Sequence, residues 1–123
     1  MIEGKVRIRP KIEFISPKEN GSSEEKFQNM SLRPIIKLQH DLLVAFFLNY
    51  LRRRKSDIYK LSSFQKNELV SKTFKNDTRF KVELRGLIIG HFTLSEYMEY
   101  QEMTVNINKR MAAMIKERLL SVL

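Results

Sequence analysis

Cysteine and tryptophan are both absent from the 123 residues of this sequence. The lack of cysteine excludes disulfide bonds, thiolate ligands for a metal and a cysteine nucleophile. It also fits a reducing compartment, so we expect a cytoplasmic protein. Glycine is scarce, with four residues, and none of them belongs to a GxGxxG phosphate loop.

A long apolar run is missing too. The longest, LLVAFFL at 42–48, is far shorter than the ~20 residues that a helix needs to cross a bilayer. The N-terminus, MIEGKVRIRPKIEF, carries charges throughout and lacks the apolar stretch of a signal peptide. We therefore expect no membrane span. The length fits one domain and is sufficient to bury a core.

Patterns for catalysis are few. The only imidazoles are His40 and His91, and no HExxH or similar metal spacing is present. Glu96, Glu99 and Glu102 share one side of an expected helix, but metal sites in helical bundles take ligands from facing helices. We predict no catalytic residue, cofactor or metal. An enzyme built around one of the two histidines stays as an alternative.

The N-terminal residues follow a different pattern from the rest. Apolar residues alternate with charged ones, at Val6, Ile8, Ile12 and Phe14. This period of two predicts an extended arm or edge strand, interrupted by Pro10. The segment SPKENGSS is rich in turn residues and predicts a linker. We expect an arm and linker at 1–23 and one helical domain at 24–123. An arm of this kind could pair with a second copy, so a homodimer is one hypothesis.

From Ser22 onward the pattern is helical. The expected helices span about 22–30, 32–54, 62–74, 77–90, 93–103 and 104–122. Three pairs have the spacing of a capping box: Ser22 with Glu25, Ser62 with Gln65, and Thr93 with Glu96. Two further residues are expected N-caps, Ser31 and Asp77. Gly90 is expected to end its helix in the left-handed conformation.

The helix expected at 32–54 has a wide apolar surface. One face carries Leu32, Ile35, Leu42, Phe46 and Tyr50, and further apolar residues make its middle apolar almost all round. A helix of this kind is usually central and buried. Together these patterns predict an all-α fold, a compact bundle of five to six helices with an extended N-terminal arm.

Positive charge dominates the composition. The net charge is +9, from 23 Lys and Arg against 14 Asp and Glu, which favours an anionic partner such as nucleic acid. Four cations follow the apolar run: Arg52, Arg53, Arg54 and Lys55. One interpretation is structural, because cations in the last turn stabilise a helix dipole. The other is a phosphate site. Its extensions would be Lys60, Lys72, Lys75, Arg79, Lys81 and Arg85.

Three blocks of the chain carry a resemblance to a known family. They are EEKFQNMSLRPIIKLQHDLL, LRGLIIGHFTLSEYMEY and NKRMAAMIKERL. They resemble an uncharacterised family of small proteins, chiefly from Bacteroidetes-type bacteria, that often carry the label glyoxalase. The resemblance covers most of 24–120 and implies a shared helical fold. The label implies a glyoxalase-related enzyme as one alternative, although the HxHxDH motif of glyoxalase II-type enzymes is absent here.

The function that we predict from these observations is non-catalytic. We expect a small basic interaction protein that binds a macromolecular partner, either a protein or a nucleic acid. Direct nucleic-acid binding through the cations at 52–55 is the first alternative, and the glyoxalase-related enzyme is the second.

Overall fold

A computed structural model describes residues 4–10 and 22–123, and within these residues the fold is entirely helical. The α-helices are α1 (Gly4–Arg7), α2 (Ser23–Phe27), α3 (Arg33–Leu38), α4 (His40–Arg53), α5 (Ser63–Asn76), α6 (Thr78–Ile89), α7 (Leu94–Gln101) and α8 (Thr104–Val122). A π-helical segment, Gln28–Leu32, and a 3-10 turn, Ile58–Lys60, complete the secondary structure of these described residues. The predicted all-α bundle is confirmed. Across the described ranges, no helix is both long and apolar enough to cross a membrane.

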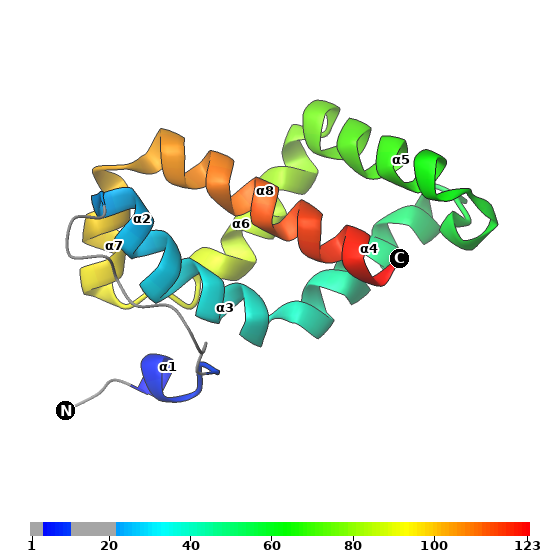
Figure 1. Cartoon of the computed structure of the whole chain (residues 1–123). Helices are drawn as coiled ribbons and strands as arrows, with labels where there is room; N and C mark the ends of the chain where they lie inside the picture. The colour runs from blue at the N-terminus through cyan, green and yellow to red at the C-terminus, as the bar shows by residue number, and fades with distance from the viewer. Residues whose placement is uncertain (1–3, 11–21) are drawn as a thin grey trace.

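The C-terminal helix α8 is the centre of the bundle. It packs against α3, α4, α5, α6 and α7, and Figure 1 shows it running through the middle of the molecule. Its buried stripe is Ile107, Met111, Ile115 and Leu119, at the spacing of one helical face. In the same view α2 and α7 lie at one end, and α5 and the end of α4 lie at the other.

The helix boundaries near Ser31 differ from those predicted. Ser31 was expected to start a new helix, but α2, the π-helical segment and α3 form one continuous helical path. The backbone is right-handed helical at Phe27 and at Leu32, on both sides of Ser31. The Ser31 side chain is buried and donates to Glu96, so it does not cap the helix. Pro34, which cannot donate to the preceding turn, follows directly, and π segments accommodate such interruptions.

The predicted helix at 32–54 is interrupted at Gln39. There the backbone leaves the helical region, with φ −90° and ψ 8°, and α4 begins at the next residue. The break changes the rotational register, so α4 buries Leu43, Phe47 and Leu51. Leu42, which was placed on the buried face, is 46% exposed. The break and the short α1 also give more helices than the five or six predicted.

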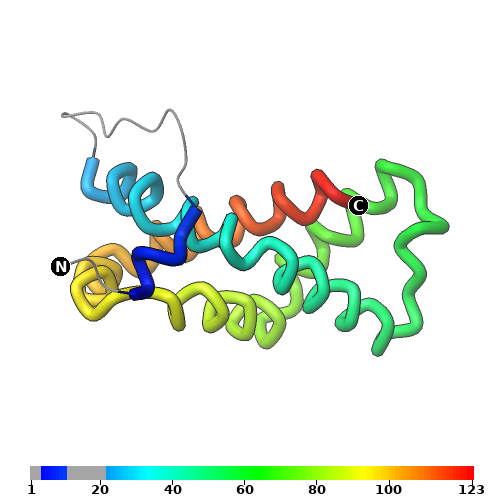
Figure 2. The backbone as a smooth tube through the Cα atoms, turned by 90° about the horizontal axis from the view of Figure 1, so that it is seen from below, coloured from blue at the N-terminus to red at the C-terminus, as the bar shows by residue number. Residues whose placement is uncertain are grey.

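The first described segment is helical where an extended arm was predicted. Gly4–Arg7 forms one helical turn, and Figure 2 shows it lying across the body of the bundle. The apolar residues that suggested a strand are exposed, Val6 at 39% and Ile8 at 57%. Polar contacts of Lys5 and Arg9 fix this turn instead. The remainder of the predicted arm and linker, with Ile12 and Phe14, lies outside the described residues.

Most of the predicted helix ends are confirmed. Capping boxes are complete at Ser62 with Gln65 and at Thr93 with Glu96, and Asp77 caps α6. The left-handed ending predicted at Gly90 is wrong, because its φ is −58°. The chain leaves α6 through two consecutive tight turns, from the amide of His91 to Ile88 O and from that of Phe92 to Ile89 O. These turns keep Gly90 right-handed.

Candidate nucleic-acid interface

The positive charge of the protein is concentrated in one part of the chain. Residues 50–85 hold 11 of the 23 Lys and Arg but only 4 of the 14 Asp and Glu, so a net +7 of the total +9 belongs to this segment. The segment comprises the end of α4, the 3-10 turn, α5 and most of α6. In Figure 1 α5 and the end of α4 lie at the end of the molecule opposite α2 and α7, whereas α6 crosses its middle.

The end of α4 displays the four predicted cations. Lys55 is the first residue beyond the C-cap and adopts φ 57°, the only positive φ of a non-glycine residue in the described chain. The amide of Ser56 donates to Leu51 O and that of Lys55 to Arg52 O, each at 3.0 Å. These two bonds define a Schellman ending, in which glycine usually takes the place that lysine has here. All four cations at 52–55 are exposed.

Arg54 has a structural role. Its Nη2 lies 2.9 Å from Asp77 Oδ2, and its guanidinium lies 4.6 Å from the centre of the Tyr50 ring. The Tyr50 hydroxyl donates to the same carboxylate oxygen at 2.6 Å. Asp77 Oδ1 accepts from the amide of Phe80 at the start of α6. The three side chains therefore connect the end of α4 to the start of α6.

These contacts shift two pKa values in opposite directions. Burial and the hydrogen bond to Asp77 raise the pKa of Tyr50 to about 12. The hydrogen bonds from Tyr50 and from the Phe80 amide, with the charge of Arg54, lower the pKa of Asp77 from its ordinary value. The neutral phenol and the charged carboxylate are thus the stable forms over the physiological range.

Two hollows lie beside this connection, and we call them the basic grooves. The first, about 590 Å³, runs along α5 and is lined by Arg54, Ser56 and Lys72 among others. The second, about 340 Å³, is lined by Arg53, Arg54 and Arg79 among others. Tyr50, Arg54 and Asp77 contribute to both grooves and form the wall between them.

The basic grooves bring together only part of the predicted set. Arg53 lines the second groove and Arg54 lies in the wall, while Arg52 and Lys55 line neither. From the predicted extensions, Lys72 and Arg79 line the grooves. Lys81 and Arg85 instead flank a small hollow against α8. The acidic side chains of the grooves already have partners, since Asp77 pairs with Arg54 and Glu83 pairs with Arg79 at 3.0 Å.

Sequence reasoning missed two exposed aromatic residues in the segment that carries the excess positive charge. Tyr59 is 68% exposed and Phe64 is 71% exposed. Tyr59 lies in the 3-10 turn between α4 and α5, and Phe64 lies in the first turn of α5. Both residues follow the cations at 52–55 in the sequence. Their polar neighbours, in DIYK and SSFQ, were the available signal.

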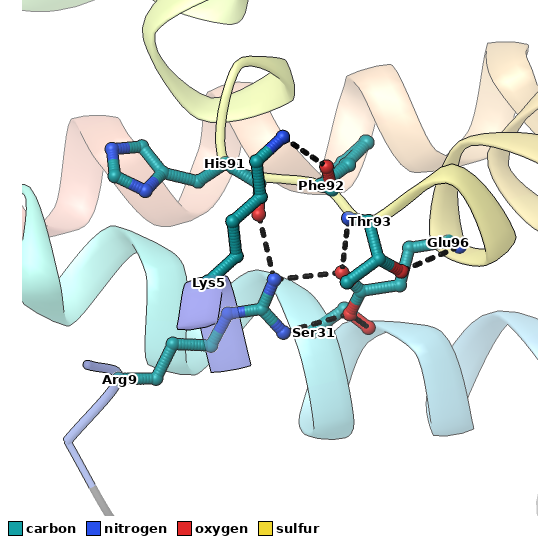
Figure 3. Close-up of polar contacts among 7 residues, drawn as sticks. All are labelled: Lys5, Arg9, Ser31, His91, Phe92, Thr93 and Glu96. Carbon is teal, nitrogen blue, oxygen red and sulfur yellow. Dashed lines mark hydrogen bonds and ion pairs between the residues drawn. The ribbon is translucent and has the colours of Figure 1, made fainter. Parts of the chain in front are cut away.

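A second polar cluster lies around Glu96, at the start of α7 (Figure 3). Arg9 binds its carboxylate with two hydrogen bonds, Nη1 to Oε2 at 2.8 Å and Nη2 to Oε1 at 2.7 Å. Ser31 Oγ donates to Oε2, and the amide of Thr93 donates to Oε1 at 2.9 Å. Both charged side chains are largely buried, with exposed fractions of 5% for Arg9 and 14% for Glu96.

The same cluster holds α1 on the body of the protein. Arg9 Nη2 also donates to His91 O at 2.7 Å, and Lys5 Nζ donates to Phe92 O at 2.9 Å. Burial by itself raises the pKa of Glu96, but the hydrogen bonds from Arg9, Ser31 and Thr93 outweigh it and leave the pKa lowered. With its oxygens accepting four hydrogen bonds, the Glu96 carboxylate is a structural anchor.

The two imidazoles lie apart from both clusters of charge. His40 Nδ1 is 3.3 Å from Arg118 Nη1, and the His91 ring points away from Glu96 in Figure 3. In the described ranges neither imidazole has a carboxylate as a hydrogen-bond partner. No group of three or more His, Cys, Asp or Glu side chains in these ranges is placed to hold a metal ion.

Comparisons with family models, with curated proteins and with solved structures give no match for this chain.

Proposed function

We propose that this protein is a non-catalytic binding protein whose partner is a nucleic acid, held through its phosphates. The surface involved, which we call the basic face, consists of the end of α4 and the two basic grooves. Its exposed cations are Arg52, Arg53, Lys55, Lys72 and Arg79. The observation that carries the proposal is the concentration of charge, a net +7 within residues 50–85.

The geometry of the basic grooves supports phosphate binding. Arg53 lines the second groove and Lys72 lines the first, while Tyr50 lines both. Neither has an ion-pair partner among the described residues, so both can accept an external anion. Guanidinium groups form paired hydrogen bonds to phosphate, and lysine offers a compact charge. Arg54 is fixed by Asp77 and stiffens the wall between the two cations.

Binding of this kind has a defined salt dependence. Each phosphate that a cation neutralises releases condensed counterions, so affinity falls steeply with added salt. The experiment is a fluorescence-anisotropy titration of labelled DNA and RNA, single- and double-stranded, between about 50 and about 200 mM salt. The proposal expects binding at low salt that weakens strongly over this range.

A matched pair of variants locates the site. Arg53→Glu with Lys72→Glu reverses two exposed cations of the basic face, and Lys26→Glu with Lys109→Glu reverses two exposed cations on α2 and α8. The net charge changes equally in both. The first pair should lower affinity about tenfold more than the second and reduce the salt slope by about two, one for each lost phosphate contact.

Three results would overturn the proposal. The first is no binding of any nucleic acid at low salt. The second is an equal loss of affinity in both double variants, because it would assign binding to net charge alone. The third is competition by polyglutamate as effective as that by nucleic acid, which would make the partner an acidic polypeptide.

A further inference from the structure

Tyr59 and Phe64 are the most exposed aromatic side chains among the described residues, at 68% and 71%. Within residues 4–10 and 22–123 the only other exposed aromatic side chain is that of Tyr97, at 39%, on α7. Removing a ring of this size from water is favourable, so most aromatic side chains of a folded protein are buried. Two rings left in solvent within six residues are therefore candidates for contact with a partner.

Both rings are carried by short, well-anchored turns. The amide of Tyr59 donates to Asp57 Oδ1 at 3.1 Å, and its neighbour Ile58 is buried at 2% exposure. Phe64 lies within the capping box of α5, where the amide of Ser62 donates to Gln65 Oε1 at 2.9 Å and Ser62 Oγ accepts from the amide of Gln65 at 3.2 Å. The backbone thus holds each ring outward.

Cationic residues lie close to the two aromatic residues in the sequence. The four cations at 52–55 precede them, and Lys60, which is exposed, lies between them. The first basic groove reaches the same connection at Ser56 and continues along α5 to Lys72. Exposed aromatic rings that are accompanied by cations are the arrangement that binds single strands, because an unpaired base can stack on a ring while the cations hold the backbone. In a duplex the bases are already stacked on one another.

We infer that the protein prefers single-stranded nucleic acid, with unpaired bases stacked on Tyr59 and Phe64 and the backbone held by the basic face. This inference rests on the proposed function and adds the class of nucleic acid. The binding surface then extends from the basic grooves around the end of the molecule that carries α5.

The test compares single-stranded and duplex oligonucleotides of equal length. Tyr59→Ala and Phe64→Ala should each weaken single-strand binding about five- to a hundredfold, the range for loss of one stacking ring. Duplex binding should change less than about twofold, and the salt slope should stay the same, because no phosphate contact is lost. Tyr97→Ala, which removes an exposed ring from α7, should leave both affinities unchanged.

A fluorescent reporter gives an independent measurement. The chain has no tryptophan, so Phe64→Trp introduces a single indole at the proposed platform. Addition of a single strand should quench its emission as a base stacks on it, and duplex should not. The matched reporter, Tyr97→Trp, should show no quenching with either ligand.

The outcomes separate this inference from the proposed function. If single strands and duplex bind equally and both alanine variants bind like the unmodified protein, the preference is wrong and phosphate binding stands. If the alanine variants weaken duplex as much as single strands, the rings do not select unpaired bases. If nothing binds at low salt, both proposals fail together.

Discussion

The Tyr50 hydroxyl lies 2.6 Å from Asp77 Oδ2, although the two residues are 27 positions apart. Asp77 also caps α6 and pairs with Arg54, so one carboxylate joins two helices and orients a cation of the basic face. This contact fixes the shape of both basic grooves, since all three side chains line each of them.

Loss of the Tyr50 hydroxyl should weaken this connection without leaving a cavity in the core. Tyr50→Phe keeps the ring that packs 4.5 Å from the centre of Phe80 and removes one hydrogen bond. We expect a stability loss of about 1 kcal/mol, measured by urea denaturation. An unchanged midpoint would show that Arg54 and the Phe80 amide suffice to hold Asp77.

Alkaline titration should show the ionisation of Tyr50 as a late step. Its pKa is raised from 10.0 to about 12, so the unfolded chain releases this proton first. The stabilisation is therefore present below pH 10.0 and is lost as the pH rises toward about 12. Absorbance of tyrosinate should show a late step that Tyr50→Phe removes. A late step that persists in the variant would assign it to another of the four tyrosines.

The buried pair of Arg9 and Glu96 should make the attachment of α1 sensitive to acid. The pKa of Glu96 is lowered from 4.5, so its stabilisation is complete above that value. It is lost as the pH falls through the lowered pKa and the carboxylate takes up a proton. We expect hydrogen exchange to show loss of protection in residues 4–10 over this acid range. Glu96→Gln should lack the protection already at neutral pH, and equal pH profiles for both proteins would contradict the assignment.

Because Lys55 has a left-handed backbone conformation, a substitution at this position should be able to raise the stability of the protein. Lys55→Gly should raise stability by about 1 kcal/mol, because glycine has no Cβ to oppose a positive φ. Lys55→Ala is the matched control, since it removes the same charge and keeps the strained conformation. A higher melting temperature for Lys55→Gly than for Lys55→Ala is the expected result. Equal melting temperatures would mean that the φ of 57° carries no cost.

Truncation of two phenylalanines should change the stability by very different amounts. Phe47 is 0% exposed and packs against Phe80, with 5.7 Å between ring centres. Phe47→Ala should cost about 3–5 kcal/mol, whereas Phe64→Ala should change stability by less than about 0.5 kcal/mol. Chemical denaturation checks both. A large loss for Phe64→Ala would mean that this ring supports the fold, which would remove it as a free stacking platform.

The sequence predicted several helix starts, because the caps that form them involve only neighbouring residues. A capping box needs only residues three apart, so Ser62 with Gln65 and Thr93 with Glu96 were recognisable in advance. The ion pair that Glu96 forms with Arg9 was not recognisable, because the two residues are 87 positions apart in the sequence. The break at Gln39 was also invisible, since the apolar pattern continues across it and the register of α4 depends on its packing against α6 and α8.

The candidate site was predictable in composition but not in geometry. Four consecutive cations are visible in the sequence, yet only Arg53 and Arg54 line the basic grooves. Which of the four cations line the grooves depends on the Schellman ending at Lys55 and on the contact of Arg54 with Asp77. A local sequence pattern does not contain this information. Phe64 was assigned to the start of a helix, and its exposure became evident only once the first turn of α5 was placed at the end of the bundle.

The uneven charge has a consequence for how the molecule approaches a partner. Four glutamates lie on the opposite end from the basic face: Glu24 and Glu25 on α2, Glu99 on α7, and Glu102 at its C-cap. The protein is therefore an electric dipole along its length, and the field of a polyanion rotates it before contact and speeds productive encounter. A molecule seated by its basic face would leave α2 and α7 pointing away from the nucleic acid.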